Sequence, residues 1–141
     1  MPLMYQQTGA TVVLMPAGRI DHASADGFRD AVAPWFDGCH DQAGGHALVF
    51  DFSGVDYISS AGLRVLMLAS KQTKPVGGRV AVAALQPIVA EIFKISRFDL
   101  VFALHATVAA AVASFADQHA GAGQQAGGTT NSAGDAPGNT R

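Results

Sequence analysis

Short apolar segments of strand-like composition alternate with segments of helical periodicity along most of this chain. The strand-like segments are residues 3–7, 11–15, 47–52, 79–83 and 100–104. Residues 47–52 form a short apolar run of the kind found in a buried central strand. The resulting order, β-β-α-β-α-β-α-β-α, predicts a single α/β domain with a mixed central sheet of about four to five strands and about four helices.

Four segments have the spacing of apolar residues that predicts helices. They begin at Asp21 or Ser24, at Ser60, at Pro87 and at Thr107, and the first, second and fourth end near residues 35, 74 and 115. In the first segment, apolar residues recur at i, i+3, i+4 and i+7 from Phe28 to Trp35, which gives one apolar stripe. Residues 16–18 are expected to end the second strand, and residues 55–58 to lead into the second helix.

The composition of the chain sets its boundaries and excludes several classes of partner. Residues 118–141 contain no aromatic and no large aliphatic residue, so this tail is predicted to be disordered and the folded domain to cover residues 1–117. A formal net charge of −2 gives no basic surface for nucleic acid and no polybasic membrane anchor. The chain begins without a signal-peptide pattern, and no apolar run approaches the roughly 20 residues of a membrane span. A cytoplasmic protein is expected.

The familiar signatures of enzymes and of metal sites are missing from the sequence. It contains no GxGxxG, no GxxxxGK[ST] and no GxSxG motif, and its five histidines have no metal-ligand spacing. The single cysteine, Cys39, is expected to be a small, half-buried, reduced residue. Asp51 and Asp56 are interpreted as acceptors of backbone hydrogen bonds rather than as an acid–base pair. No catalytic residue, metal or cofactor is therefore predicted.

Two adjacent serines, Ser59 and Ser60, lie where an extended segment turns into a helix. One of them is expected to cap the helix, which leaves the other hydroxyl beside the small residues Ala61 and Gly62 and open to another protein's active site. A phosphate there would lie at the positive end of the helix dipole, with Arg64 one turn further on. The local chemistry suits a phosphoacceptor, while helix capping alone is the alternative interpretation, because many helices begin with serine.

Three stretches of the sequence resemble one known family. They are GRIDH at residues 18–22, FDFSGVDYISSAGL at residues 50–63, and GGRVAVAALQP at residues 77–87, the last followed by IFKIS at residues 92–96 and by Phe98. Together they make residues 3–117 resemble the STAS-domain anti-sigma factor antagonists, also called anti-anti-sigma factors, and so imply the STAS fold.

The resemblance implies a phosphoprotein in signal transduction that regulates transcription by partner switching. In this family the unphosphorylated protein binds an anti-sigma factor that is also a serine/threonine kinase, which frees the sigma factor. The kinase uses ATP to phosphorylate the serine two positions before a Gly-Leu pair, and a PP2C-type phosphatase reverses the reaction. That position is Ser60 here. Ser59 is the alternative, because many members have aspartate in its place.

The resemblance also implies a partner-binding surface, while two other functions stay open. The surface would comprise Asp21, which matches an aspartate of the family near the kinase interface, with His22, Ser59, Ser60, Ala61, Gly62 and Arg64. This interpretation describes a monomeric binding module that is not an enzyme. The first alternative is a STAS scaffold or accessory subunit of a stressosome-like or lipid-transport complex. The second is a small hydrolase that uses Ser60 with His22 and Asp21.

Overall fold

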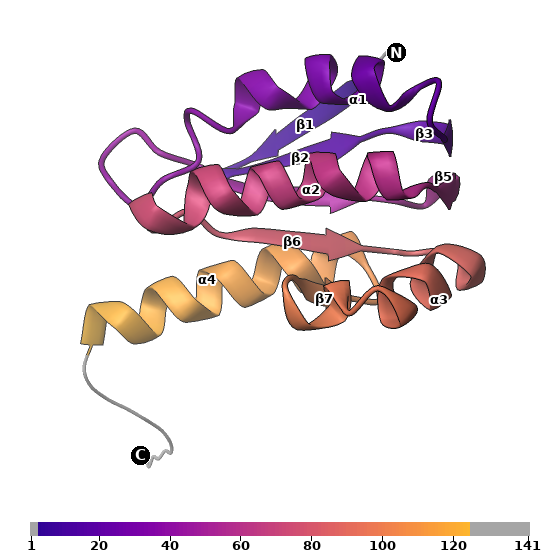
Figure 1. The fold of residues 1–141 in the computed structure, drawn as a ribbon. Helices are drawn as coiled ribbons and strands as arrows, with labels where there is room; N and C mark the ends of the chain where they lie inside the picture. Colours follow the sequence, from indigo (N-terminus) through magenta and orange to yellow (C-terminus); the bar gives the residue numbers. More distant parts are fainter. Residues whose placement is uncertain (1–2, 125–141) are drawn as a thin grey trace. The chain divides into compact units, whose positions relative to one another are not determined.

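A mixed five-stranded β-sheet forms the centre of the fold. The structure is a computed structural model, and it describes residues 3–124. The strands are β1 (Met4–Thr8), β2 (Thr11–Met15), β4 (Ala47–Asp51), β6 (Val80–Ala83) and β7 (Ala103–His105), in the spatial order β1-β2-β4-β6-β7. Strand β1 is antiparallel to β2, and all other neighbours are parallel. The predicted mixed α/β architecture is therefore confirmed (Figure 1).

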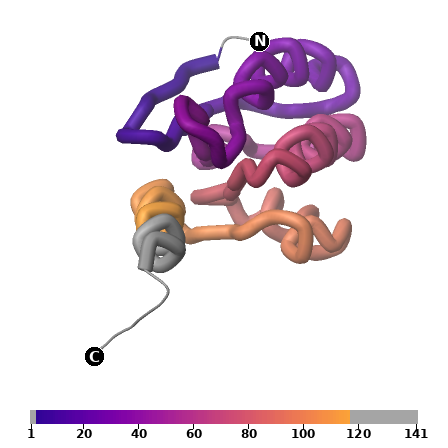
Figure 2. The backbone as a smooth tube through the Cα atoms, turned by 90° about the vertical axis from the view of Figure 1, so that its left-hand side faces the viewer, coloured from indigo at the N-terminus to yellow at the C-terminus, as the bar shows by residue number. Residues whose placement is uncertain are grey.

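The helices of the described chain are α1 (Ala25–Val32), α2 (Ser60–Thr73), α3 (Pro87–Ile95) and α4 (Val108–Gln124). Helices α1 and α2 cover the same face of the sheet, as Figure 1 and the turned view in Figure 2 both show. Short 3-10 segments follow three of the helices, at Ala33–Trp35, Lys74–Val76 and Phe98–Leu100. None of the helices within residues 3–124 has both the length and the apolar character to cross a membrane.

Helix α4 continues beyond the domain boundary that the sequence predicts. It runs to Gln124, whereas composition placed the end of the folded domain at residue 117. The chain divides after Ala111 into two compact units, and the first unit contains both sheets and helices α1 to α3. The rest of the predicted tail, residues 125–141, lies outside the described residues.

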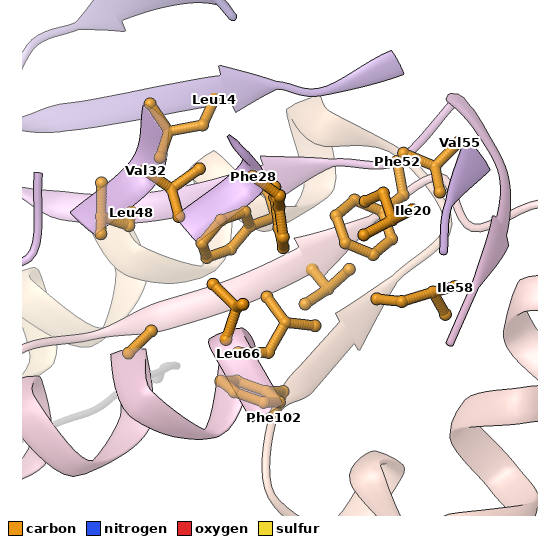
Figure 3. Close-up of a cluster of buried hydrophobic side chains, with 14 of the residues drawn as sticks. Leu14, Ile20, Phe28, Val32, Leu48, Phe52, Val55, Ile58, Leu66 and Phe102 are labelled. Atoms are coloured by element: carbon orange, nitrogen blue, oxygen red, sulfur yellow. The ribbon is translucent and has the colours of Figure 1, made fainter. Parts of the chain in front are cut away.

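The core forms between the five-stranded sheet and helices α1 and α2. Figure 3 shows Phe28 of α1 and Leu66 of α2 directed toward the same buried cluster as Phe52, which follows β4. All three side chains are fully buried, and burying a large apolar side chain stabilises a fold by roughly 1.5–3 kcal/mol. The ring of Phe52 also meets the ring of Phe93 edge-on, with their centroids 6.0 Å apart. This packing holds helices α1 and α2 against the sheet, and Phe93 adds a contact from helix α3.

A second, two-stranded sheet is the feature that the sequence analysis missed. Strand β3 (Ala17–Ile20) pairs in parallel with β5 (Gly54–Ile58). Strand β2 ends at Met15, as residues 16–18 predict, but the chain resumes as a strand at Ala17. Residues 55–58 lead into α2, as expected, and are themselves part of strand β5. The pair is anchored because Ile20 and Ile58 are register partners and both are buried. The register shifts between Gly18 and Arg19, and Gly18 has a φ of +89°, which explains why this segment has the composition of a turn.

The last strand is also displaced from its expected position. Residues 100–104 were expected to form it, but Phe98–Leu100 is a 3-10 turn and β7 covers Ala103–His105. A continuous apolar run has no alternation from which strand limits can be read. Arg97, with a φ of +63°, turns the chain just before this segment.

One non-glycine residue in a loop next to the sheet is expected to be a source of strain. Ala84, directly after β6, has a φ of +60°, a conformation that costs an L-residue roughly 1–2 kcal/mol. We expect Ala84→Gly to raise the free energy of unfolding by about 0.5–1 kcal/mol in urea titrations, after the larger unfolded-state entropy of glycine is allowed for. Ala106→Gly, at an exposed position without a positive φ, should instead lower it. Equal effects of the two variants would contradict this account.

Candidate functional site

The parallel pair β3–β5 brings two loops together at one end of the fold. Helix α1 follows β3 after residues 21–24, and helix α2 follows β5 after Ser59. The carboxyl ends of β3 and β5 therefore lie side by side at the right of Figure 1, where both helices begin. A backbone hydrogen bond extends the pairing into the loops, because the Ser59 N–H donates to the Ile20 carbonyl over 2.8 Å. Residues that precede α1 and α2 thus share one surface.

The two adjacent serines have different roles in the structure. Ser59 is the N-cap of α2, where its Oγ accepts a hydrogen bond from the Gly62 N–H at 3.2 Å and its carbonyl accepts one from Leu63. Its φ and ψ of −88° and 173° are the extended values of an N-cap. Ser60 is the first residue of the helix and is exposed. The expectation that one serine caps the helix is confirmed, and the capping serine is Ser59.

The neighbours of Ser60 divide into packed and exposed residues. Gly62 is buried, and a Cβ at this position would lie 2.8 Å from Cγ2 of Ile20 and 2.8 Å from Cγ1 of Ile58. Ala61 is half-buried, and Arg64 is exposed with no ion pair among the side chains of residues 3–116. Gly62 therefore permits close packing of α2 on the β3–β5 pair, and the accessible surface here belongs to Ser60 and Arg64.

Both oxygens of the Asp21 carboxylate have a partner. Oδ1 accepts hydrogen bonds from the Ser24 N–H at 3.0 Å and from the Ser24 hydroxyl, 3.1 Å away. The Ser24 hydroxyl oxygen in turn accepts the Asp21 N–H at 2.9 Å, and it also lies 2.9 Å from the Arg19 carbonyl. Oδ2 is 3.4 Å from Nε of Arg19. Ser24 is the N-cap residue of α1, but its side chain makes no capping bond, because its hydroxyl is used within this loop.

Three residues of this surface were not predicted as functional: Arg19, Ser24 and Tyr57. Arg19 and Tyr57 are register partners in β3 and β5, and the Arg19 guanidinium lies 4.1 Å from the centroid of the Tyr57 ring. The signal that could have found them is the strand alternation. Once Ile20 and Ile58 are assigned to the core, the preceding residue of each strand must face outward.

The hydrogen bonds from Ser24 lower the pKa of Asp21. The Ser24 amide is the largest cause, followed by its hydroxyl, while partial desolvation acts in the opposite direction and the charge of Arg19 adds a smaller lowering. Because the pKa is lower in the folded protein than in the unfolded chain, ionised Asp21 stabilises the fold at pH values above its unfolded pKa. This contribution is lost as the pH falls through the folded pKa.

Removal of the Ser24 hydroxyl should therefore be visible in the titration of Asp21. We expect Ser24→Ala to raise the pKa of Asp21 toward its ordinary value, because one of the two Ser24 donors to Oδ1 is lost. Ser24→Thr, which keeps a hydroxyl, should leave the pKa close to that of the wild type. The measurement is a pH titration of the Asp21 carboxyl carbon by NMR. An unchanged pKa in Ser24→Ala would show that the hydroxyl does not orient or stabilise the carboxylate.

The other residues that the sequence offered as catalytic or metal-binding candidates do not form a site in the described structure. His22 is exposed, and among residues 3–124 it makes no hydrogen bond with Asp21 or Ser60, so the geometry gives the hydrolase hypothesis no support. Asp51 Oδ1 accepts the Ser53 N–H at 2.9 Å, as expected, whereas Asp56 is an exposed residue of strand β5. The described side chains contain no cluster of three or more metal-ligating residues.

Cys39 differs from the expectation in its burial. It is fully buried rather than half-buried, and its Sγ lies 3.6 Å from the Arg79 carbonyl. Burial raises the pKa of the thiol to about 11, so the group stays protonated at neutral pH. Cys39 is therefore a core residue at a distance in sequence from the two site loops.

Comparison with known proteins identifies the family. The model of the STAS domain family matches residues 2–111. BtrV of Bordetella bronchiseptica, a proposed anti-sigma factor antagonist, is 33% identical over 115 residues, which are 82% of this chain and 95% of that protein.

Solved structures of anti-sigma factor antagonists have the same fold. One from Mycobacterium paratuberculosis matches with a TM-score of 0.68 at 24% identity, over 80% of this chain and 92% of that one. SpoIIAA in its unphosphorylated form matches with a TM-score of 0.66 at 19% identity, over 82% and 97% of the two chains. Bacillus SpoIIAA in its phosphorylated form matches with a TM-score of 0.59 at 18% identity, over 81% and 99%. The chain described here belongs to the STAS domain family, among its anti-sigma factor antagonists.

Proposed function

We propose that this protein frees a sigma factor by a partner switch that phosphorylation of Ser60 controls. In this proposal the unmodified protein, acting as a monomer in the cytoplasm, binds an anti-sigma factor that is also a serine/threonine kinase. The kinase transfers the γ-phosphoryl group of ATP to the Ser60 hydroxyl, which ends the interaction, and a PP2C-type phosphatase restores the binding form. The protein itself is a substrate and binding module, not an enzyme.

The observation that carries the proposal is that Ser59 caps helix α2 while Ser60 is exposed and free of this role. Ser59 Oγ accepts the Gly62 N–H, so a phosphate on Ser59 would disturb the cap of α2. Ser60 is exposed and its side chain has no hydrogen bond to the described side chains and backbone of residues 3–116, so its modification requires no bond within this part of the fold to break. Ser60 is thus favoured over Ser59 as the acceptor.

The fold is well suited to retain its structure after the modification. A phosphoserine adds about −1.5 to −2 charges at neutral pH. At position 60 this charge lies at the N-terminus of α2, where the helix dipole favours anions by roughly 0.3–1 kcal/mol. The phosphate would therefore change the charge of the binding surface without unfolding the domain. SpoIIAA, whose unphosphorylated and phosphorylated forms both resemble this fold, offers a parallel.

Affinity capture followed by reconstitution tests the proposal. The Ser60→Ala protein serves as bait in lysate of its host, because a switch that cannot be phosphorylated should retain its partner, and captured proteins are identified by mass spectrometry. We expect an anti-sigma factor with a kinase domain, which with ATP then phosphorylates the wild-type protein on Ser60. Transporter subunits or a large STAS assembly in place of a kinase would favour the scaffold hypothesis and overturn the switch.

A further inference from the structure

Arg19 is held on the outer face of the β3–β5 pair by two interactions. Its guanidinium lies 4.1 Å from the centroid of the Tyr57 ring, within the range of a cation–π contact. Its Nε lies 3.4 Å from Oδ2 of Asp21. The Arg19 side chain is 61% exposed, so the half-buried Tyr57 ring, rather than general burial, restricts its position.

The carboxylate of Asp21 is held from both sides although it is accessible. Arg19 contacts Oδ2, and the Ser24 amide and hydroxyl contact Oδ1, while the Asp21 side chain keeps 38% exposure. An aspartate with this exposure in a loop would ordinarily sample several rotamers. Here each oxygen has its own partner, and the Ile20–Ser59 backbone bond fixes the loop beside the loop of Ser60.

We propose that Arg19, Tyr57 and Ser24 are positioning residues that hold the Asp21 carboxylate in one orientation for the partner that also contacts Ser60. This inference rests on the proposed function, since it adds three residues to the binding surface around Ser60. Tyr57 acts on Asp21 indirectly, because its ring fixes Arg19 and Arg19 in turn fixes Asp21. The carboxylate then presents its free lone pairs to the partner without further ordering.

An Asp21 carboxylate that is already ordered should bind the partner more tightly, because the partner does not have to immobilise it. Immobilising a flexible side chain on binding weakens an interface by about two- to tenfold. Release of Asp21 should therefore weaken binding by that factor, much less than a phosphate on Ser60. Tyr57→Phe keeps the aromatic face and should preserve the affinity, whereas Tyr57→Leu removes the face and should lower it.

The first part of the test uses the free protein and needs no partner. NMR three-bond couplings between Hα and Hβ report the χ1 rotamer of Asp21. We expect one rotamer in the wild type and in Tyr57→Phe, and averaged couplings in Tyr57→Leu and in Arg19→Ala. A single rotamer in both of the latter variants would overturn the proposal, because the carboxylate would then be oriented without Arg19 and Tyr57.

The second part is a double-mutant cycle with the kinase obtained by capture on the Ser60→Ala bait. Tyr57→Leu should weaken binding two- to tenfold in the wild-type background and have no effect in the Asp21→Ala background, because Tyr57 acts through Asp21. The same loss in both backgrounds would show that Tyr57 contacts the kinase directly, and would overturn the positioning role. Failure of the wild type to bind would overturn the proposed function, while the couplings would still decide whether Asp21 is held.

Discussion

Ser60→Glu is expected to weaken binding to the proposed partner, an anti-sigma factor kinase, several hundredfold. Ser60 is exposed at the first position of α2, beside the loop of Asp21, so the new carboxylate would enter the interface and lose its hydration there. A desolvated charge without a partner costs roughly 3–4 kcal/mol, and each 1.4 kcal/mol or so changes the affinity tenfold. Isothermal titration calorimetry with the purified kinase measures this directly.

Ser53→Glu is the matched control for this prediction. It introduces the same charge on an exposed serine, but Ser53 precedes β5 and Ser60 follows it. The two positions are therefore separated by the length of a five-residue strand, on the order of 17 Å. Binding by Ser53→Glu should remain near that of the wild type. Equal affinities for Ser60→Glu and the wild type would rule out a switch that acts through charge at this position.

Gly62→Val is expected to lower the free energy of unfolding by about 1–3 kcal/mol, the range for overpacking a buried site. Its Cβ would lie 2.8 Å from Ile20 Cγ2 and 2.8 Å from Ile58 Cγ1, and these two residues are the buried register partners of β3 and β5. Neither isoleucine can withdraw easily, because both are packed in the core. Helix α2 must therefore move away from the β3–β5 pair.

Chemical denaturation and amide exchange together measure the effect of Gly62→Val. The Ser59 N–H, which donates to the Ile20 carbonyl in the wild type, should exchange faster when the two loops separate. Ala61→Val, one position earlier and only half-buried, is the control, and it should cost no more than the helix propensity difference of about 0.5 kcal/mol. If Gly62→Val had the same free energy of unfolding as Ala61→Val, the packing at Gly62 would not be tight.

Local patterns predicted most of the fold. The five strands of the large sheet and the four helices were expected from apolar runs and helical periodicity, although helix α4 extends further than the composition of the chain indicates. The two serines also predicted the start of α2 within a residue, because a hydroxyl at an N-cap has a local physical role.

The site could be predicted only in part, because its geometry depends on pairing between segments distant in sequence. Pro16 and Gly18 have the composition of a turn, yet Ala17–Ile20 is a strand, since Ile20 has the buried Ile58 as its partner. Without that pairing, Arg19 and Tyr57 cannot be placed together. The sequence also did not indicate that Ser24 would orient Asp21 instead of capping α1.

Intact-mass and phosphopeptide analysis of the protein purified from its own host tests the central claim most directly. The account predicts a mixed population in which the modified fraction has a single phosphate, located on Ser60, at a level that changes with growth state. A phosphate on Ser59 would contradict the assignment of the acceptor, because Ser59 Oγ accepts the Gly62 N–H as the cap of α2. No phosphate in any growth state would contradict the partner switch itself.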